Sequence, residues 1–141
     1  MKGGNEMRRL MVSLALSSVL AACSEGTTGP DGQAAFKIEV AGEGFSETFI
    51  VEVATESQAA ELQSLLDTDA TGVILGDLVA GDGGYNQPWS WHLDPATVHA
   101  ADAAMEVCDG RPSMVEDDLQ YWIGTVGSYC PWGAQVVERI R

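Results

Sequence analysis

Two short segments of alternating apolar and polar residues, separated by a turn, restrict most strongly how this 141-residue chain folds. Residues 36–40 (FKIEV) and 48–53 (TFIVEV) place apolar side chains at every second position, as strands with one buried face do. The sequence between them, AGEGFS, has the composition of a tight turn. We therefore predict a β-hairpin in which Phe49, Val51 and Val53 share one face.

The segment that follows the hairpin has the features of an amphipathic helix. Thr55 precedes it and Gln58 stands three residues later, which is the capping-box pattern of a helix start. Apolar residues then recur at helical spacing, so we predict a helix over residues 56–67. The residues on its buried face are Ala59, Leu62 and Leu66.

The rest of the domain changes between strand-like and helix-like sequence. Strands are predicted at residues 73–79, 89–94 and 134–140, and a second helix at residues 113–123. Residues 96–107 fit either structure, because their alanines favour a helix while their β-branched ends favour a strand. A regular βαβ rhythm is missing from this pattern. The predicted fold class is therefore α+β, a single small mixed or antiparallel sheet with two helices on one face.

The N-terminus carries the parts of an export signal. A positively charged leader precedes an apolar run, residues 10–20, which is shorter than the roughly 20 apolar residues that cross a bilayer. The run ends in the sequence LAAC, residues 20–23, which resembles the lipobox of bacterial lipoproteins. That resemblance implies that residues 1–22 are a cleaved signal peptide and that Cys23 carries the lipid. A plain signal peptide with an incidental Cys is the alternative.

A tether and one domain follow the expected lipidation site. Residues 24–33 have no strongly apolar side chain and are rich in Gly, Thr and Pro, so residues 23–33 are expected to be a flexible tether. Residues 34–141 have the length of an ordinary single domain. We expect the chain in the bacterial cell envelope, anchored by lipid to the outer membrane or the cell surface, with this domain outside the cytoplasm.

After removal of the signal peptide the chain is strongly acidic. The whole chain has 7 Lys and Arg and 21 Asp and Glu, of which residues 1–22 hold three basic and one acidic, leaving four against 20 and a formal charge of −16. A field of this sign repels phosphate backbones, which argues against nucleic-acid binding. Cations and basic proteins remain plausible partners. The alternative is that the charge only keeps an exported protein soluble.

Two cysteines remain once Cys23 is assigned to the lipid, and these are Cys108 and Cys130. In an exported domain such a pair forms a disulfide in most cases. The loop of about 22 residues would contribute roughly 3 kcal/mol by restricting the unfolded chain. A thioredoxin-type redox motif needs a second Cys where Gly133 stands. We therefore predict a structural disulfide.

Several short blocks form an ordered signature along the domain. They are Tyr85-Asn86, WSWHLDP at residues 89–95, EVCD at residues 106–109, Val115-Glu116 and CPW at residues 130–132. Together they resemble the small domain family named after the N-terminal part of a seventy-four-kilodalton slime-mould protein, over roughly residues 36–140. The resemblance implies a shared fold with a core around these blocks. It implies no activity or cofactor, because none is settled for the family.

The sequence GYNQPWSWHLDP, residues 84–95, concentrates aromatic and polar side chains on one short segment. If residues 89–94 form a strand, Trp89, Trp91 and Leu93 share the face that suits the core. Packing is therefore the expected role of the two tryptophans.

The loop in front of this strand has the composition of a recognition surface. Aromatic rings with amide neighbours supply both stacking and hydrogen-bond contacts, which suit peptides and glycans. The alternative is that Tyr85 and Asn86 only close the loop before Pro88. The predicted ligand-binding residues are Tyr85, Asn86, Trp89, Trp91, His92 and Asp94, with Gln87 and Tyr129 as further members of an aromatic and amide rim.

The opposite face of the same strand carries Ser90, His92 and Asp94, the residue types of a hydrolase triad. No nucleophile elbow or Gly-rich oxyanion loop accompanies them. His92 and Asp94 would also supply two ligands to zinc. The residues that would supply a third ligand are His99, Glu106 and Asp109. The alternative is a His paired with a carboxylate that holds one tautomer.

A second cation site is suggested by the end of the predicted first helix. Asp67, Asp69 and Thr71 stand at positions 1, 3 and 5 of a calcium-binding loop, and a helix precedes them as in an EF-hand. Leu78 stands at position 12, so the bidentate Glu is missing and only weak calcium binding would follow. The alternative is a polar turn in which Gly72 supplies an unusual backbone angle.

These patterns together predict a non-catalytic, lipid-anchored, disulfide-bonded binding module that displays the aromatic loop. The expected partners are the membrane, through the N-terminal lipid, and an unknown protein, peptide or glycan, with no nucleic acid among them. The alternative is a cation-dependent protein, either a weak calcium-binding module or a metal-dependent hydrolase that uses His92. We expect no cofactor in the first case and calcium or a catalytic metal in the second.

Overall fold

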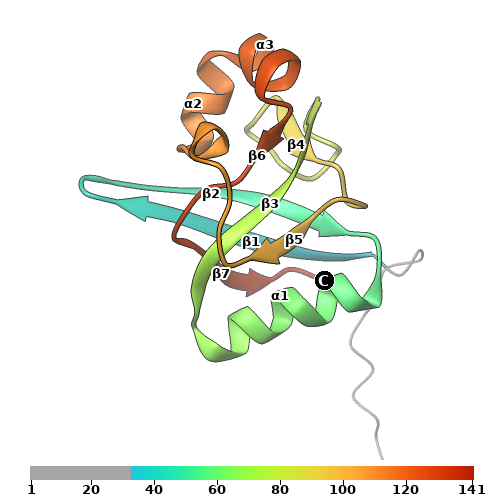
Figure 1. Cartoon of the computed structure of the whole chain (residues 1–141). Helices are drawn as coiled ribbons and strands as arrows, with labels where there is room; N and C mark the ends of the chain where they lie inside the picture. Colours follow the sequence, from blue (N-terminus) through green and yellow to red (C-terminus); the bar gives the residue numbers. More distant parts are fainter. Residues whose placement is uncertain (1–32) are drawn as a thin grey trace, which may run out of the picture.

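The computed structural model describes residues 33–141 (Figure 1). One antiparallel sheet of seven strands runs through this part of the chain, in the order β2-β1-β7-β3-β4, with β5 and β6 also paired to β3. The strands are β1 (Ala34–Gly42), β2 (Phe45–Val53), β3 (Thr71–Ala80), β4 (Trp91–Leu93), β5 (His99–Ala101), β6 (Ser128–Tyr129) and β7 (Ala134–Arg139). The predicted α+β class with a single sheet is confirmed.

The helices lie at two ends of the molecule. They are α1 (Glu56–Thr68), α2 (Pro112–Asp117) and α3 (Leu119–Tyr121), together with a 3₁₀ turn (Glu106–Cys108) and a π-helical turn (Trp122–Val126). Figure 1 shows α1 beside β7 and β5, whereas α2 and α3 lie at the opposite end, beyond β6 and β4.

β1 and β2 form the predicted hairpin. Gly42 pairs with Phe45, so the connection is a two-residue loop whose second residue, Gly44, has a φ of +81°. Glycine adopts this angle without the steric penalty of a Cβ atom, and such angles characterise two-residue hairpin turns. The predicted inward face is confirmed, because Phe49, Val51 and Val53 are all buried.

The first helix begins as the sequence predicts and ends differently. Thr55 Oγ1 accepts a hydrogen bond from the Gln58 backbone N–H at 3.2 Å, and Gln58 Oε1 accepts one from the Thr55 N–H at 2.9 Å. This is the predicted capping box. At the other end Asp69 takes the left-handed conformation, with a φ of 53°. Gly72 therefore does not supply the unusual angle, and it lies within β3.

The second predicted helix, residues 113–123, is broken at Asp118. Its backbone leaves the helical region there, with φ −140° and ψ 60°, and its side chain accepts a hydrogen bond from the Tyr121 N–H at 3.3 Å. Asp competes in this way with the helical backbone for local hydrogen bonds. The chain continues through α3 into the π-helical turn, which ends at Gly127 with a φ of 79°.

The strand predicted at residues 89–94 is shorter than expected, because only Trp91–Leu93 pair with β3. The Trp89 N–H instead bonds to the Asn86 carbonyl at 3.1 Å, inside the preceding turn. The ambiguous stretch 96–107 contains a short strand, β5, and the beginning of the 3₁₀ turn.

An aromatic cluster joins the sheet to the helical end of the molecule. The Tyr129 ring lies at the centre, with its centroid 5.4 Å from Phe49, 5.3 Å from Trp91 and 6.0 Å from Trp122. All three contacts are edge-to-face, the arrangement that the charge distribution of aromatic rings favours. Because the four rings come from β2, β4, β6 and the π-helical turn, they hold these elements around one core.

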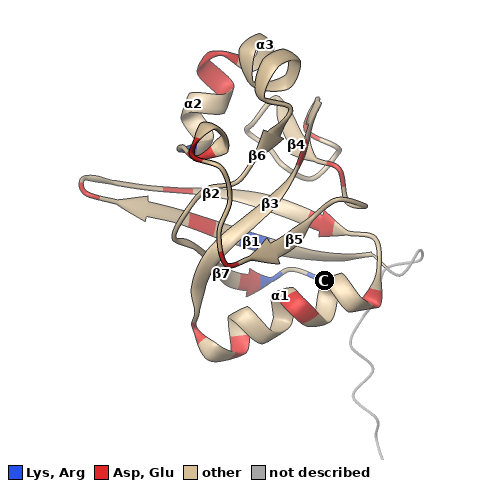
Figure 2. Ribbon diagram, viewed as in Figure 1, with Lys and Arg blue, Asp and Glu red and all other residues tan. Residues whose placement is uncertain are grey.

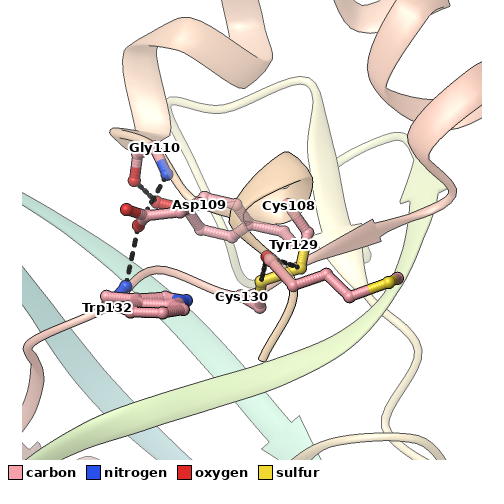
Figure 3. Close-up of a disulfide and its surroundings, with 7 residues drawn as sticks. Cys108, Asp109, Gly110, Tyr129, Cys130 and Trp132 are labelled. Atoms are coloured by element: carbon pink, nitrogen blue, oxygen red, sulfur yellow. Dashed lines mark hydrogen bonds between the residues drawn. A yellow bond between two sulfur atoms is a disulfide. The ribbon is translucent and has the colours of Figure 1, made fainter. Parts of the chain in front are cut away.

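Cys108 and Cys130 form the predicted disulfide, with their Cα atoms 5.1 Å apart (Figure 3). Two further contacts attach the same turn to the end of β6. Asp109 Oδ1 accepts the Trp132 backbone N–H at 2.8 Å, and the Tyr129 hydroxyl donates to the Gly110 carbonyl at 2.9 Å. The disulfide is thus one of several links between residues 105–110 and residues 128–132.

The predicted signal peptide and the predicted lipidation site Cys23 lie outside the described residues. Within residues 33–141, no helix has the length and apolar character needed to cross a membrane.

Candidate functional site

Residues 81–90, which we call the aromatic loop, connect β3 to β4. The Gly81 N–H closes the loop by donating to the Ser90 carbonyl at 2.8 Å. Gly83 has a φ of +64°, and a Cβ atom there would lie 2.8 Å from the Tyr85 ring and 3.0 Å from the His92 ring. Only glycine therefore fits this position without displacing both rings.

Asn86 lies in the interior as a bridge between strands. Its side chain is fully buried, its Oδ1 atom accepts the Ile50 backbone N–H at 2.7 Å, and its Nδ2 atom donates to the Trp91 carbonyl at 2.7 Å. The amide thus satisfies one group on β2 and one on β4 that would otherwise lose water without compensation. In this structure Asn86 presents no surface to a ligand.

The two tryptophans of the segment have different positions. Trp91 is fully buried, between Phe49 and Tyr129 in the aromatic cluster. Trp89 is half-buried, stacks on Trp91 with ring centroids 6.2 Å apart, and donates from Nε1 to the Thr48 carbonyl at 2.8 Å. Part of the Trp89 ring therefore remains available at the surface.

A hollow of about 410 Å³ opens on the outer side of the aromatic loop, and we call it the loop hollow. Its lining combines an aromatic ring, a carboxylate, an amide and a hydroxyl. The lining residues are Gly81, Asp82, Gln87, Pro88, Trp89 and Ser90.

Asp82 is the charged group of the loop hollow. Its Oδ1 atom accepts the Gly84 backbone N–H at 2.8 Å, and its Oδ2 atom accepts from Gln87 Nε2 at 3.0 Å. These hydrogen bonds, the first more than the second, lower the pKa of the carboxyl below its ordinary value. Asp82 therefore remains ionised at neutral pH and fixes the position of the Gln87 amide.

Asp82 was not among the residues that the sequence singled out. Its signal is local, since an Asp followed by two glycines is typical of a turn in which the carboxylate binds the backbone.

Ser90, His92 and Asp94 each bond to a different neighbour. Ser90 Oγ donates to Glu116 Oε1 at 2.8 Å, and His92 Nδ1 lies 2.7 Å from the Gly81 carbonyl, to which it donates. Asp94 Oδ1 accepts the Ala96 backbone N–H at 3.0 Å. None of these side-chain hydrogen bonds joins one of the three residues to another, so the structure does not assemble them as a triad.

The two predicted tyrosines also serve the fold. Tyr129 is fully buried, and burial raises the pKa of its hydroxyl. Tyr85 is half-buried, its hydroxyl donates to the Leu93 carbonyl at 3.1 Å, and burial raises its pKa to about 12. The Tyr85 ring meets the His92 ring edge-on, with centroids 5.7 Å apart.

The predicted calcium ligands lie on three successive elements of the chain. Asp67, in the last turn of α1, accepts from Gln63 Nε2 at 2.8 Å, and the Asp69 carboxylate accepts from Gln135. Thr71 is the first residue of β3. Across residues 33–141, no three His, Cys, Asp or Glu side chains are grouped so as to hold a metal ion. Calcium binding stays a prediction.

The blocks of the sequence signature contact one another in space. Ser90 bonds to Glu116 through both its hydroxyl and its backbone N–H, and Asp109 bonds to Trp132. With the disulfide and the bond between Asn86 and Trp91, these contacts link all five blocks around the aromatic cluster. The signature therefore describes a structural framework.

The family model for the N-terminal domain of the seventy-four-kilodalton slime-mould protein matches residues 33–141 of the chain. No curated protein and no solved structure matches it. The chain belongs to this N-terminal domain family, as its sequence signature predicts.

Proposed function

We propose that this member of the family is a non-catalytic binding module of the bacterial cell envelope. A lipid on Cys23 would hold it to the membrane, and the loop hollow would be its ligand site. One observation carries the proposal: a loop fixed to three other elements presents an open hollow lined by mixed polar and aromatic groups.

The fixation of the loop supports binding because it lowers the entropy lost when a ligand is held. Asn86 attaches the loop to β2 and β4, Trp89 attaches it to β2, and Ser90 attaches it to α2 through Glu116. The groups that line the hollow are therefore held in place before a ligand arrives.

The lining fits a neutral saccharide. The exposed part of the Trp89 ring offers a surface on which the C–H face of a sugar ring can stack. Asp82 retains free lone pairs for sugar hydroxyls, and Gln87 supplies both an acceptor and a donor. A hollow of about 410 Å³ lies within the usual range of ligand sites. An anionic saccharide would be repelled by Asp82 and by the net charge.

The absence of catalysis is supported by the way the reactive residue types are used. Ser90, His92 and Asp94 hold the β3–β4 connection and the turn after β4 through their separate hydrogen bonds. A nucleophile needs its general base within hydrogen-bond reach, and His92 instead donates from Nδ1 to a backbone carbonyl.

A saccharide array with matched variants tests the proposal. The purified full chain is expected to bind at least one immobilised neutral oligosaccharide, and Asp82→Asn combined with Gln87→Ala is expected to abolish that signal. Asp117→Asn combined with Gln120→Ala removes the same groups from another exposed surface and should leave it unchanged. Failure of the wild-type chain to bind any neutral saccharide would refute the proposed ligand class.

A further inference from the structure

We propose that a second surface, the groove between the end of β3 and α3, docks a cationic amphipathic segment of a partner protein. We call it the β3–α3 groove, and it has a volume of about 510 Å³. Its lining residues are Ala80, Leu119, Gln120, Ile123 and Gly124. No residue lines both this groove and the loop hollow, so the inference is independent of the proposed function.

The floor of the groove is apolar and rigid. Leu119 and Ile123 are one helical turn apart, and both pack with part of their surface against the buried core while the rest stays exposed. Figure 1 shows the end of β3 beside α3, where Ala80 forms the opposite wall.

Further apolar surface lies next to the groove in the sequence of both walls. Val79 adjoins Ala80 and is 37% exposed, and Tyr121 lies within α3 and is 46% exposed. Apolar side chains in water at these positions favour a partner that removes them from it.

Acidic residues surround this apolar floor. Glu116, Asp117 and Asp118 directly precede Leu119, and Asp82 follows Ala80 by two residues on the other wall. Residues 77–82 and 112–126 contain no Lys or Arg. The surroundings of the groove are therefore uniformly negative.

The basic residues of residues 33–141 are engaged elsewhere. Figure 2 shows basic side chains on β1, β7 and near the C-terminus, away from the acidic end that contains α2. Their contacts are Lys37 with Glu138, Arg141 with Glu52, Arg111 over the Phe45 ring and Arg139 over the Phe36 ring. The acidic rim thus has no counter-charge within this part of the chain, and a partner would supply it.

An apolar floor with an acidic rim is complementary to a basic amphipathic helix. Leu or Ile side chains at helical spacing would enter the groove, while Lys and Arg on either side would meet the carboxylates. The charge would also attract such a partner from a distance at low ionic strength. Anionic membranes and nucleic acids would be repelled by the same rim.

A labelled amphipathic peptide of Leu and Lys is the probe, and fluorescence anisotropy with the full chain is the readout. Saturable binding is expected, and it should weaken as salt is added. A peptide of the same composition without amphipathic order should bind at least tenfold more weakly. Equal binding of both peptides, or no binding of the amphipathic one, would overturn the proposal.

One variant blocks the groove without disturbing the core. A Cβ atom at Gly124 meets no atom within 4 Å, and its backbone is not in the left-handed region. Gly124→Gln should therefore fold with an unchanged Tm, fill the groove and weaken peptide binding at least tenfold. Binding equal to that of wild type would show that the peptide lies elsewhere and would contradict the proposal.

A second pair of variants tests the charge. Asp117→Lys changes the rim at an exposed residue, whereas Glu43→Lys makes the same change at the tip of the β1–β2 hairpin. Asp117→Lys is expected to weaken binding several-fold more than Glu43→Lys at low salt, and equal effects would count against the groove. Saccharide binding by Gly124→Gln should stay at the wild-type level, which separates this surface from the loop hollow.

Discussion

Asn86 Oδ1 accepts the backbone N–H of Ile50 at 2.7 Å, and this bond covers the outer edge of the sheet. β2 is the last strand on its side, so Thr48 and Ile50 direct backbone groups away from β1. Trp89 Nε1 covers the Thr48 carbonyl in the same way. Exposed strand edges invite pairing with other chains, and the aromatic loop prevents this at the centre of β2.

Replacement of Asn86 tests this structural role. Asn86→Ala would leave the Ile50 N–H and the Trp91 carbonyl without their partner, so we expect the free energy of unfolding to fall by about 2 to 4 kcal/mol. Chemical denaturation with the disulfide intact measures this change. Gln87→Ala, at an exposed neighbour, should cost no more than about 0.5 kcal/mol. An Asn86 variant as stable as the Gln87 variant would remove the bridge from consideration.

The raised pKa of Tyr85 predicts how stability depends on alkaline pH. Burial lifts this pKa from 10.0 to about 12, so between these values the unfolded chain releases the hydroxyl proton while the folded chain retains it. The unfolded state then binds fewer protons, and stability that is complete below pH 10 is lost as the pH rises toward 12. Tyr85→Phe should lose less stability across this window than wild type, measured by thermal melts. Identical pH profiles would contradict the assignment to Tyr85.

Replacement of Cys23 tests the expected lipid anchor. Wild-type chain should fractionate with the membrane and show by mass spectrometry the added mass of acyl chains on its N-terminal Cys. Cys23→Ala should appear in the soluble fraction, because nothing else in the sequence favours attachment to an anionic membrane. Retention of the variant in the membrane fraction would mean that another segment anchors the protein.

Calcium titration separates the binding module from the cation-dependent alternative. The Asp67 and Asp69 carboxylates already accept hydrogen bonds from Gln63 and Gln135, and the ligand set has no bidentate Glu. We therefore expect an affinity no stronger than about millimolar by calorimetry. A saturable micromolar signal that Asp67→Asn and Asp69→Asn together remove would favour the alternative. Asn tolerates the left-handed conformation at position 69, which keeps this variant interpretable.

The parts of the fold that the sequence predicts correctly depend on neighbours in the chain. The β1–β2 hairpin follows from alternation around a two-residue turn, and the start of α1 follows from Thr55 and Gln58. The Cys108–Cys130 disulfide follows from the number of cysteines available in an exported domain.

The parts that the sequence does not predict depend on distant contacts. The break at Asp118 is one such case, because Leu119 and Trp122 on its C-terminal side turn toward the core. Asn86 is another, since its burial requires an N–H that is 36 residues away in the sequence. A polar loop residue with such a partner cannot be distinguished by composition from one that faces a ligand.

The loop hollow follows the same rule. Gln87 and Trp89 were identifiable from the aromatic segment, whereas the place of Asp82 beside them depends on the turn that Gly83 and Gly84 allow. The sequence therefore indicates the segment that carries the candidate site, and the folded chain decides which of its side chains reach solvent.

Titration of the ¹⁵N-labelled chain with neutral saccharides, followed by NMR, tests the loop hollow most directly. For at least one saccharide, we predict saturable shifts of the Gln87 side-chain amide, the Trp89 indole N–H and the Ser90 backbone N–H. The Trp91 indole, which is buried in the core, should move less. Shifts confined to residues outside 81–90, or no shifts with any neutral saccharide, would contradict a saccharide site in the loop hollow.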